Sequence, residues 1–423
     1  MQPTSPGVDI QTNKNIFYVS NYTNEIAAFV GYFERGPINT PIFISNVNEF
    51  KFLFGRGIGE YYNDWYQVYN YLQYSSGIYV CRSSDEDIYN ANSIEHSAED
   101  MQDLDFSFED LQTANGFVDL EIENPVFDVS VNEREDFDNL IGAFPASADM
   151  GWIAQTAGGW GNLLRVAIIT SAEWKTNSTI YGNIKAKSRF PKFEEGYYGI
   201  CIIRKDTVVE TFYKTFDNIS QINDESKYVY VDYTKVYSRY GDDAFTLTDG
   251  RNFLPNPRQL EENHNIFADK EIYDIDIIIG NDRANELAVA VAEKRRDCIA
   301  FIGIPAKFDE YLISEEGEHL YTPDGKLLIF NTGSIPLKPK EIDIHNVQEY
   351  ISTIPNSMFV HFTCNLKYQY DGFTNTHKKV NLAGDIAGLK AQASLKTPWM
   401  PSAGLERGNI KNMDHTFPVF DMN

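Results

Sequence analysis

Hydrophobic positions near the start of the chain follow first a strand-like and then a helix-like period. Ala27–Ile42 holds an apolar run, a Gly-Pro pair and a second apolar run, a pattern that predicts a buried strand, a turn and another strand. Ser45 is suited to cap the helix that follows, in which apolar residues recur at helical spacing. Residues 21–85 are therefore predicted to fold as an α/β unit with strands Phe29–Phe33, Pro41–Ile44 and Ile78–Arg82 and helices Val47–Phe54 and Tyr62–Tyr74.

Residues 1–20 precede this unit as a segment in which apolar and polar positions alternate. The alternation and the β-branched content predict extended chain. Such an arm is either a disordered tail or a strand that pairs with the sheet edge of another subunit, and composition alone favours the tail. The residues of the arm expected to make a subunit contact are Val8, Ile10, Ile16, Tyr18 and Val19.

Residues 86–150 differ in charge from the rest of the chain. Arg134 is the only Lys or Arg between Ser93 and Asp149, whereas acidic residues follow one another closely. Apolar residues such as Phe106 and Phe117 still recur, which favours a small folded insert over a linker. We expect this acidic insert to face outward.

Strand patterns dominate residues 151–264, and helix–strand alternation returns in residues 265–412. Arg204–Thr207 is predicted to be a tight hairpin turn between two strands. The simplest architecture is an α/β (α+β) fold in which a discontinuous core domain, residues 21–85 and 265–412, is interrupted by a β-rich insertion domain, residues 151–264. That domain carries the acidic insert, and residues 413–423 form a tail. The remaining predicted elements are strands Leu164–Ile169, Tyr197–Arg204, Val208–Tyr213, Tyr228–Asp232, Ile275–Ile279, Cys298–Ile304, Met358–Thr363 and Lys367–Tyr370 and helices Asn285–Arg296 and Leu382–Ala393.

Length and composition exclude several classes of protein. A chain of 423 residues, 43% hydrophobic, buries a core in each of two or three domains without disulfides. The net charge of −25 argues against contact with nucleic acid and favours soluble subunits that repel one another before assembly. Neither a signal peptide nor an apolar run of about 20 residues is found, so no membrane contact is expected and the protein is predicted to be made in a cytoplasm.

A search for catalytic, cofactor and metal motifs finds none. The glycines of Phe54–Gly59 follow a predicted helix and are explained by a helix end, and those of Ala157–Asn162 by a tight loop that Trp160 anchors. The four cysteines and seven histidines lack the spacing of a metal site, and no nucleophile elbow is present. Lys294–Arg296 is interpreted as the cationic end of a helix, although Asp297 opposes the same dipole. No enzyme, cofactor or metal is therefore predicted.

A series of short motifs nevertheless runs from the arm to Ile410, namely Pro6-Gly7-Val8, Ala28–Gly31, Arg35-Gly36-Pro37, Tyr79–Arg82, Gly159-Trp160-Gly161-Asn162, Lys367-Tyr368-Gln369-Tyr370-Asp371, Leu382–Leu389 and Pro398–Gly408. In their order and spacing these motifs resemble the tail sheath proteins of contractile-tailed bacteriophages. The family-motif residues taken as the candidate core are Gly31, Gly36, Pro37, Trp160, Gly161, Tyr368, Asp385, Trp399, Gly404 and Arg407. Two departures accompany it, the order Pro401-Ser402 and the expected lack of the family's usual carboxyl-terminal domain.

The resemblance implies a virion protein, assembled in the cytoplasm of the host bacterium, that polymerises as a helical stack of rings around a tail tube. It also implies contraction without a cofactor and contacts with the tube, baseplate and tail terminator proteins. The resemblance also changes the interpretation of residues 1–20, which are now expected to be a strand donated to a neighbouring subunit and not a disordered tail. The alternatives are a sheath-like cap or collar protein and, in a different class, an α/β enzyme that the empty motif search disfavours.

Overall fold

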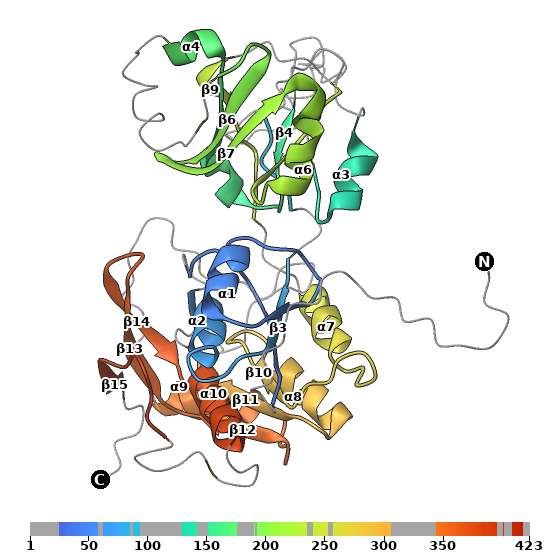
Figure 1. Ribbon diagram of the computed structural model, residues 1–423. Helices are drawn as coiled ribbons and strands as arrows, with labels where there is room; N and C mark the ends of the chain where they lie inside the picture. Colours follow the sequence, from blue (N-terminus) through green and yellow to red (C-terminus); the bar gives the residue numbers. More distant parts are fainter. Residues whose placement is uncertain are drawn as a thin grey trace, which may run out of the picture. The chain divides into compact units, whose positions relative to one another are not determined.

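In the computed structural model, residues 25–57, 62–84, 88–93, 129–141, 151–175, 190, 193–234, 240–252, 257–305, 344–395, 401 and 408–417 are described. These residues fall into two compact units, which are described one at a time (Figure 1). The first unit contains the described residues up to Gly31, Pro41–Cys81 and those from Leu260 onward. The second contains Tyr32–Thr40 and the described residues from Arg82 to Gln259.

The first unit is built on a six-stranded sheet with the order β12-β11-β10-β1-β3-β2. β1, β10, β11 and β12 run parallel, and β2 runs antiparallel to β3. Because β1, β10 and β11 have helices on both faces of the sheet, they are almost continuously apolar. The strands are β1 (Ala27–Gly31), β2 (Ile42–Ile44), β3 (Ile78–Arg82), β10 (Ile277–Ile279), β11 (Ile299–Gly303) and β12 (Val360–Thr363).

Helices cover this sheet and bury its side chains. Ala28, Val30 and Ile278 belong to a core that also includes Leu260 and Phe267, at and just beyond α7, and Val289 of α8. α2 and α10 pack on each other and contact β1, β10 and β11. The helices are α1 (Val47–Phe54), α2 (Tyr62–Tyr71), α7 (Pro257–Ile266), α8 (Asn285–Arg295), α9 (Ile344–Thr353) and α10 (Ala383–Ser394).

A second, three-stranded antiparallel sheet in the first unit has the order β14-β13-β15. Its central strand is β13 (Leu366–Asp371), joined to β14 (Thr376–Asn381) by a short turn, with β15 (His415–Phe417) on the other side. β13 carries the Lys367–Asp371 motif and α10 carries the Leu382–Leu389 motif, so this sheet and the α2–α10 pair bring both motifs into one unit.

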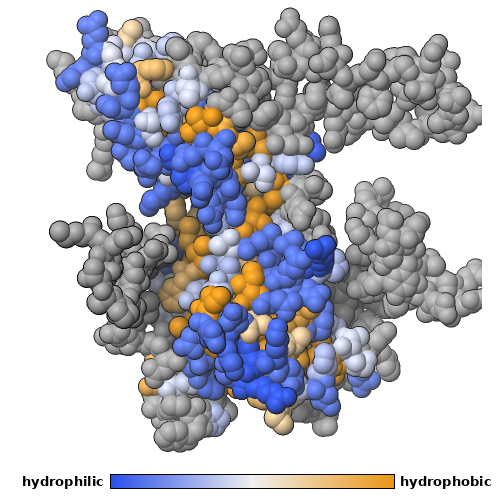
Figure 2. All heavy atoms as spheres, turned by 90° about the vertical axis from the view of Figure 1, so that its right-hand side faces the viewer, coloured by the Kyte–Doolittle hydropathy of each residue, from blue (hydrophilic) through white to orange (hydrophobic). Residues whose placement is uncertain are grey.

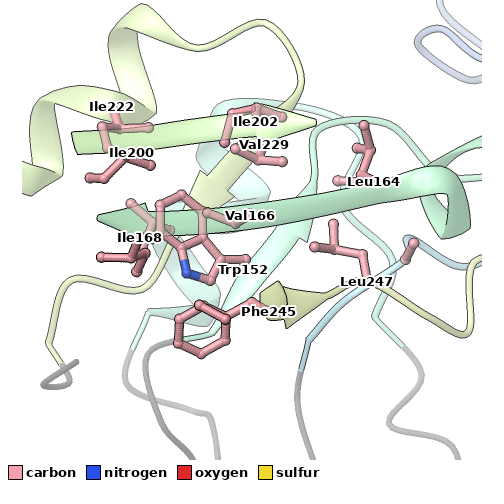
Figure 3. Close-up of a cluster of buried hydrophobic side chains, with 14 of the residues drawn as sticks. Trp152, Leu164, Val166, Ile168, Ile200, Ile202, Ile222, Val229, Phe245 and Leu247 are labelled. Carbon is pink, nitrogen blue, oxygen red and sulfur yellow. The ribbon is translucent and has the colours of Figure 1, made fainter. Parts of the chain in front are cut away.

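The second unit contains a four-stranded antiparallel sheet of order β7-β6-β5-β9 and a two-stranded sheet of β4 and β8. Figure 3 shows how Val166, Ile168, Ile200 and Ile202 of the larger sheet meet Trp152 of β4 in a shared core. The strands are β4 (Trp152–Ala154), β5 (Leu164–Ile169), β6 (Tyr197–Arg204), β7 (Thr207–Thr215), β8 (Val229–Val231) and β9 (Gly241–Thr246). The helical segments are α3 (Arg134–Leu140), η3 (Gly159–Leu163), α4 (Ser171–Lys175), η4 (Phe216–Gln221) and α6 (Ile222–Glu225).

The structure confirms a fold of mixed helices and sheets, and most predicted elements are found within a few residues of their expected ends. The predicted tight turn after Arg204 is a two-residue hairpin loop in which Lys205 has a φ of 54°. The nesting of one domain inside another remains a prediction. Of the acidic insert, only residues 88–93 and 129–141 are described, and there Val129, Val131 and Phe137 form a small core with Ile153 and Tyr230.

Three local predictions are corrected. The cap of α1 is Asn46 and not Ser45, because Oδ1 of Asn46 accepts from the amide of Glu49 at 3.0 Å, while Ser45 donates to the Glu49 carboxylate. α2 ends at Tyr71 and not at Tyr74. The amides of Gln73 and Tyr74 donate to carbonyl oxygens three residues earlier in the chain, and not four as in an α-helix. β1 ends at Gly31 and not at Phe33, because the residues that follow are held by partners in the second unit, such as Arg204 for Glu34.

Surface properties add little to a functional assignment. No helix in the described ranges is long and apolar enough to cross a membrane. On the face drawn in Figure 2, hydrophilic residues are interspersed with smaller hydrophobic areas. Isolated exposed apolar side chains such as Ile272 and Met358 are ordinary for a folded protein and carry no functional conclusion by themselves.

His264, in the last turn of α7, predicts acid sensitivity. Its ring is buried, Nδ1 lies 2.7 Å from the carbonyl oxygen of Leu260, and burial lowers its pKa to about 4. Because the unfolded chain takes up this proton near pH 6.5, the stabilisation is complete above that pH and is lost as the pH falls towards 4. Between pH 7.5 and pH 5 we expect a loss of about 2 kcal/mol from this group alone.

Urea unfolding of the wild type and of His264→Phe at these two pH values measures this effect. The phenylalanine variant keeps the ring shape but cannot be protonated, so its free energy of unfolding should fall less over the same interval. Equal losses in the two proteins would show that the buried imidazole does not cause the acid sensitivity.

Candidate functional site

Among the described residues, no group of three or more His, Cys, Asp or Glu residues is placed to hold a metal ion. Burial raises the pKa of the Cys81 and Cys201 thiols to about 12, so both stay protonated and unreactive at neutral pH. A pocket of about 570 Å³ lies beside the loop before β12, lined by Glu293, Arg296, Asn356, Ser357, Met358 and Phe359. The candidate functional site is taken to be the family-motif residues and the contacts that they make with other parts of the chain.

In the second unit the motifs meet at Arg82, the last residue of β3. Its fully buried guanidinium donates through Nη1 to the carbonyl oxygens of Gly36 at 2.9 Å and Ala157 at 2.8 Å. Nη2 donates to Oδ1 of Asn252 at 3.2 Å. Burial lowers the pKa of Arg82 to about 10, so the side chain remains charged at neutral pH. Arg82 thus ties together three segments that are far apart in the sequence.

The residues before Gly36 are held in the same unit by charge. Glu34, whose side chain is 3% exposed, forms an ion pair of 2.9 Å with Arg204 at the end of β6. The guanidinium of Arg35 lies 5.4 Å from the ring centre of Trp160 and 5.5 Å from that of Tyr228. Cation–π contacts of a desolvated arginine stabilise by about 2 kcal/mol or more. These contacts fix the Arg35-Gly36-Pro37 motif against the Trp160 loop.

The loop around Trp160 requires glycines, because neighbouring atoms lie where the Cβ atom of any other residue would be. Gly158 has a φ of 132°, and a Cβ atom there would lie 2.3 Å from Oδ1 of Asn252. A Cβ atom on Gly161 would lie 2.6 Å from that of Ala91. Trp160 is buried and donates from Nε1 to the carbonyl oxygen of Thr156 at 3.0 Å. The Gly159–Asn162 motif is accordingly a loop that is packed through Trp160 and Gly161.

In the first unit, the Lys367–Asp371 and Leu382–Leu389 motifs meet in a buried ion pair. Nζ of Lys367, on β13, lies 2.8 Å from Oδ1 of Asp385, on α10, and both side chains are almost completely buried. The hydroxyl of Tyr74 donates to the same oxygen at 2.9 Å, and Lys367 donates to the carbonyl oxygen of Lys411 at 3.1 Å. Burial lowers the pKa of Lys367 and raises that of Asp385, and each charge opposes the shift of the other. The network connects β13, α10, Tyr74 and the segment before β15.

Two glycines of α10 let it approach α2 closely. A Cβ atom on Gly384 would lie 2.2 Å from the carbonyl oxygen of Gln67, and one on Gly388 would lie 3.0 Å from that of Tyr71. The amide of Gly384 also donates to Oε1 of Gln67 at 2.7 Å. Since the obstacles are backbone atoms, they cannot swing aside. The Leu382–Leu389 motif is therefore a helix–helix packing surface.

The other predicted residues are distributed over both units. Gly31 is the last residue of β1, and a Cβ atom there would lie 2.4 Å from the Phe29 ring. Pro37 follows Gly36 in the second unit, and Tyr368 lies on β13. The structure therefore brings Gly36, Pro37, Trp160 and Gly161 into one unit and Gly31, Tyr368 and Asp385 into the other. Outside the described residues lie Val8, Ile10, Ile16, Tyr18, Val19, Trp399, Gly404 and Arg407.

Sequence reasoning missed the buried cations. The motifs include Arg82 and Lys367, and both side chains are buried; for Arg82, a charge directly after the apolar run of β3 is a signal that it has fixed partners. From the sequence, Arg295 is interpreted only through the helix dipole. In the structure it donates to the carbonyl oxygens of Phe267 and Tyr273 and pairs with Asp297 at 2.9 Å, which explains the acidic residue after the basic run.

Comparison with curated proteins finds two sequence relatives. The tail sheath protein of Enterobacteria phage T4 is 20% identical over 515 aligned positions, which cover 97% of this chain and 76% of that protein. The tail sheath protein of Vibrio phage KVP40 is 29% identical over 162 residues, 35% of this chain and 22% of that protein. The chain thus spans about a fifth of one relative and three quarters of the other. No family model matches the chain.

Solved structures with some likeness are distant. The sheath tail protein from Listeria innocua superposes with a TM-score of 0.39 and 12% identity, over 85% of this chain and 69% of that one. The sheath tail protein from Desulfitobacterium hafniense gives a TM-score of 0.38 and 9% identity, over 77% and 59%. These scores are too low to support an argument, so the relationship rests on the two curated sequences.

Proposed function

We propose that this chain, which its curated relatives support as a phage tail sheath protein, is a structural subunit of a contractile tail. The observation that carries the proposal is the similarity to the T4 tail sheath protein across 97% of the chain. In this role, copies of the chain polymerise as a helical sleeve around the tail tube. The sleeve shortens and drives the tube through the host envelope.

A mechanical role fits the chemistry of the motif residues. Such work needs no cofactor, because the energy is stored as the difference between two sets of subunit contacts. It does require subunits that keep their shape while their contacts change. The buried Lys367–Asp385 and Glu34–Arg204 pairs and the Gly384 helix contact each fix the packing within one unit, which supports this reading.

The proposed partners are further copies of this chain, the tail tube protein, and the baseplate and tail terminator proteins. The proposed location is the virion tail, after assembly in the bacterial cytoplasm. The net charge of −25 suits free subunits that must remain soluble before they assemble. We also propose that the β-rich part is inserted into the α/β core and that the acidic residues 86–150 face outward.

The arm of residues 1–20 is proposed to donate a strand to a neighbouring subunit. Deleting Met1–Ser20 should leave the midpoint of thermal unfolding nearly unchanged, because the arm precedes the first buried strand, but should prevent the formation of rods. Electron microscopy and calorimetry of the deletion variant measure the two effects.

A full-length control separates the sequence of the arm from its length. Replacing Val8, Ile10 and Ile16 by serine should abolish rods, whereas replacing Gln2, Thr4 and Gln11 by serine should not. Rods formed by the deletion variant would refute strand donation.

A further inference from the structure

The amino-terminal segment joins the folded body at Glu25 and Ile26, which are held by several elements. Oε1 of Glu25 lies 2.6 Å from Nζ of Lys390 on α10, and the carbonyl oxygen of Glu25 accepts from the hydroxyl of Tyr71 on α2 at 3.3 Å. The amide of Ile26 donates to Oδ2 of Asp276 at 2.9 Å, and its carbonyl oxygen accepts from the amide of Asp276 at 2.9 Å. Two residues are thus fixed by three separate parts of the first unit.

The strand that follows these residues occupies the middle of the six-stranded sheet. β1 lies between β10 and β3, and each of its five residues is buried. Ala27, Ala28 and Phe29 pair with Ile277, Ile278 and Ile279 in parallel register. A pull directed along β1 therefore loads its hydrogen bonds to both neighbouring strands at once.

Lys390 has a particular role at this junction because it pairs with Glu25 and its charge also acts on the Asp276 carboxyl, which accepts from the Ile26 amide. Burial raises the pKa of the Asp276 carboxyl, the hydrogen bond from the Ile26 amide lowers it, the charges of Glu25 and Asp274 raise it, and the charge of Lys390 lowers it. Nζ of Lys390 also donates to Oγ of Ser394 at 2.5 Å, which fixes the ammonium on α10. Without this cation, Glu25 and Asp276 would repel each other at the point where the chain enters the sheet.

We infer that Lys390, Glu25 and Asp276 form an anchor that fixes the root of the amino-terminal segment, so that tension on the segment is carried by the central strand β1. The purpose of the anchor rests on the proposed function, because a strand donated to a neighbour in a contracting lattice is under tension. The anchor itself is a property of the single chain.

Hydrogen exchange on the full-length, unassembled protein tests the anchor. Lys390→Met keeps the apolar stem but removes the charge, and the amides of Ile26 and Ala27 should then exchange about tenfold faster. Lys294→Met, at an exposed position of α8, is the matched control and should leave these amides unchanged. Adding Glu25→Gln to Lys390→Met should restore part of the protection, because it removes the repulsion.

Single-molecule pulling supplies a mechanical readout. One handle is placed at the amino terminus and the other on a cysteine replacing Gly372, where nothing lies within 4 Å of an added side chain. The force that extracts β1 should fall by about half in Lys390→Met and stay unchanged in Lys294→Met. Equal protection and equal force in these two variants would overturn the anchor. Failure of the wild type to form rods would instead refute the proposed sheath function and leave both measurements of the anchor valid.

Discussion

Gly384→Ala is expected to lower the free energy of unfolding of the first unit by about 3 kcal/mol. In a free helix this change would stabilise by about 1 kcal/mol, since alanine has the higher helix propensity. Here the added Cβ atom would lie 2.2 Å from the carbonyl oxygen of Gln67, so α10 and α2 must move apart. The loss of packing outweighs the gain in propensity.

Urea unfolding followed by tyrosine and tryptophan fluorescence measures this loss. Gly372→Ala is the matched control, because no atom lies within 4 Å of a Cβ atom at that position. It should change the free energy of unfolding by less than about 0.5 kcal/mol. If both variants were equally stable, the close contact between α10 and α2 would not be a requirement of the fold.

Asp385→Ala is expected to cost about 3–5 kcal/mol, because it leaves the ammonium of Lys367 buried without its carboxylate. The Tyr74 hydroxyl loses an acceptor in the same change. Lys367→Met should cost a similar amount by leaving Asp385 buried and uncompensated. These would be among the most damaging single substitutions in the first unit.

The double variant Lys367→Met/Asp385→Leu distinguishes two explanations of the pair. If the pair mainly avoids a lone buried charge, the double variant should recover most of the lost stability, since apolar replacements of buried pairs are often near neutral. Chemical unfolding of the wild type, Lys367→Met, Asp385→Leu and the double variant gives the coupling energy directly. A double variant as unstable as the sum of the singles would show that the hydrogen bonds themselves are needed.

The sequence predicted local secondary structure better than it predicted which distant residues of the chain contact one another. Helix Val47–Phe54 and strand Ile78–Arg82 were given their correct bounds, because periodicity and a terminal glycine define them locally. The departure of the chain at Tyr32 into the second unit was missed. Ala27–Ile42 has the local pattern of strand, turn and strand, and only contacts with Asn132, Thr156 and Arg204 decide where the turn belongs.

The motifs were recognised without their physical reasons. Gly384 and Gly388 are needed for the approach of two backbones, one of which lies more than 300 residues earlier in the chain. Arg82 contacts Gly36, Ala157 and Asn252, which are 46, 75 and 170 residues away. Pattern reasoning on neighbouring residues contains no information on such distant pairs, whereas resemblance to a family marked the positions without explaining them.

The central claim is that copies of this chain assemble as a tail sheath, and electron microscopy of the purified full-length protein at high concentration tests it most directly. The account predicts hollow, striated rods whose formation requires Met1–Ser20. Protein that remains monomeric, or that stops at single rings as a cap or collar protein would, contradicts it.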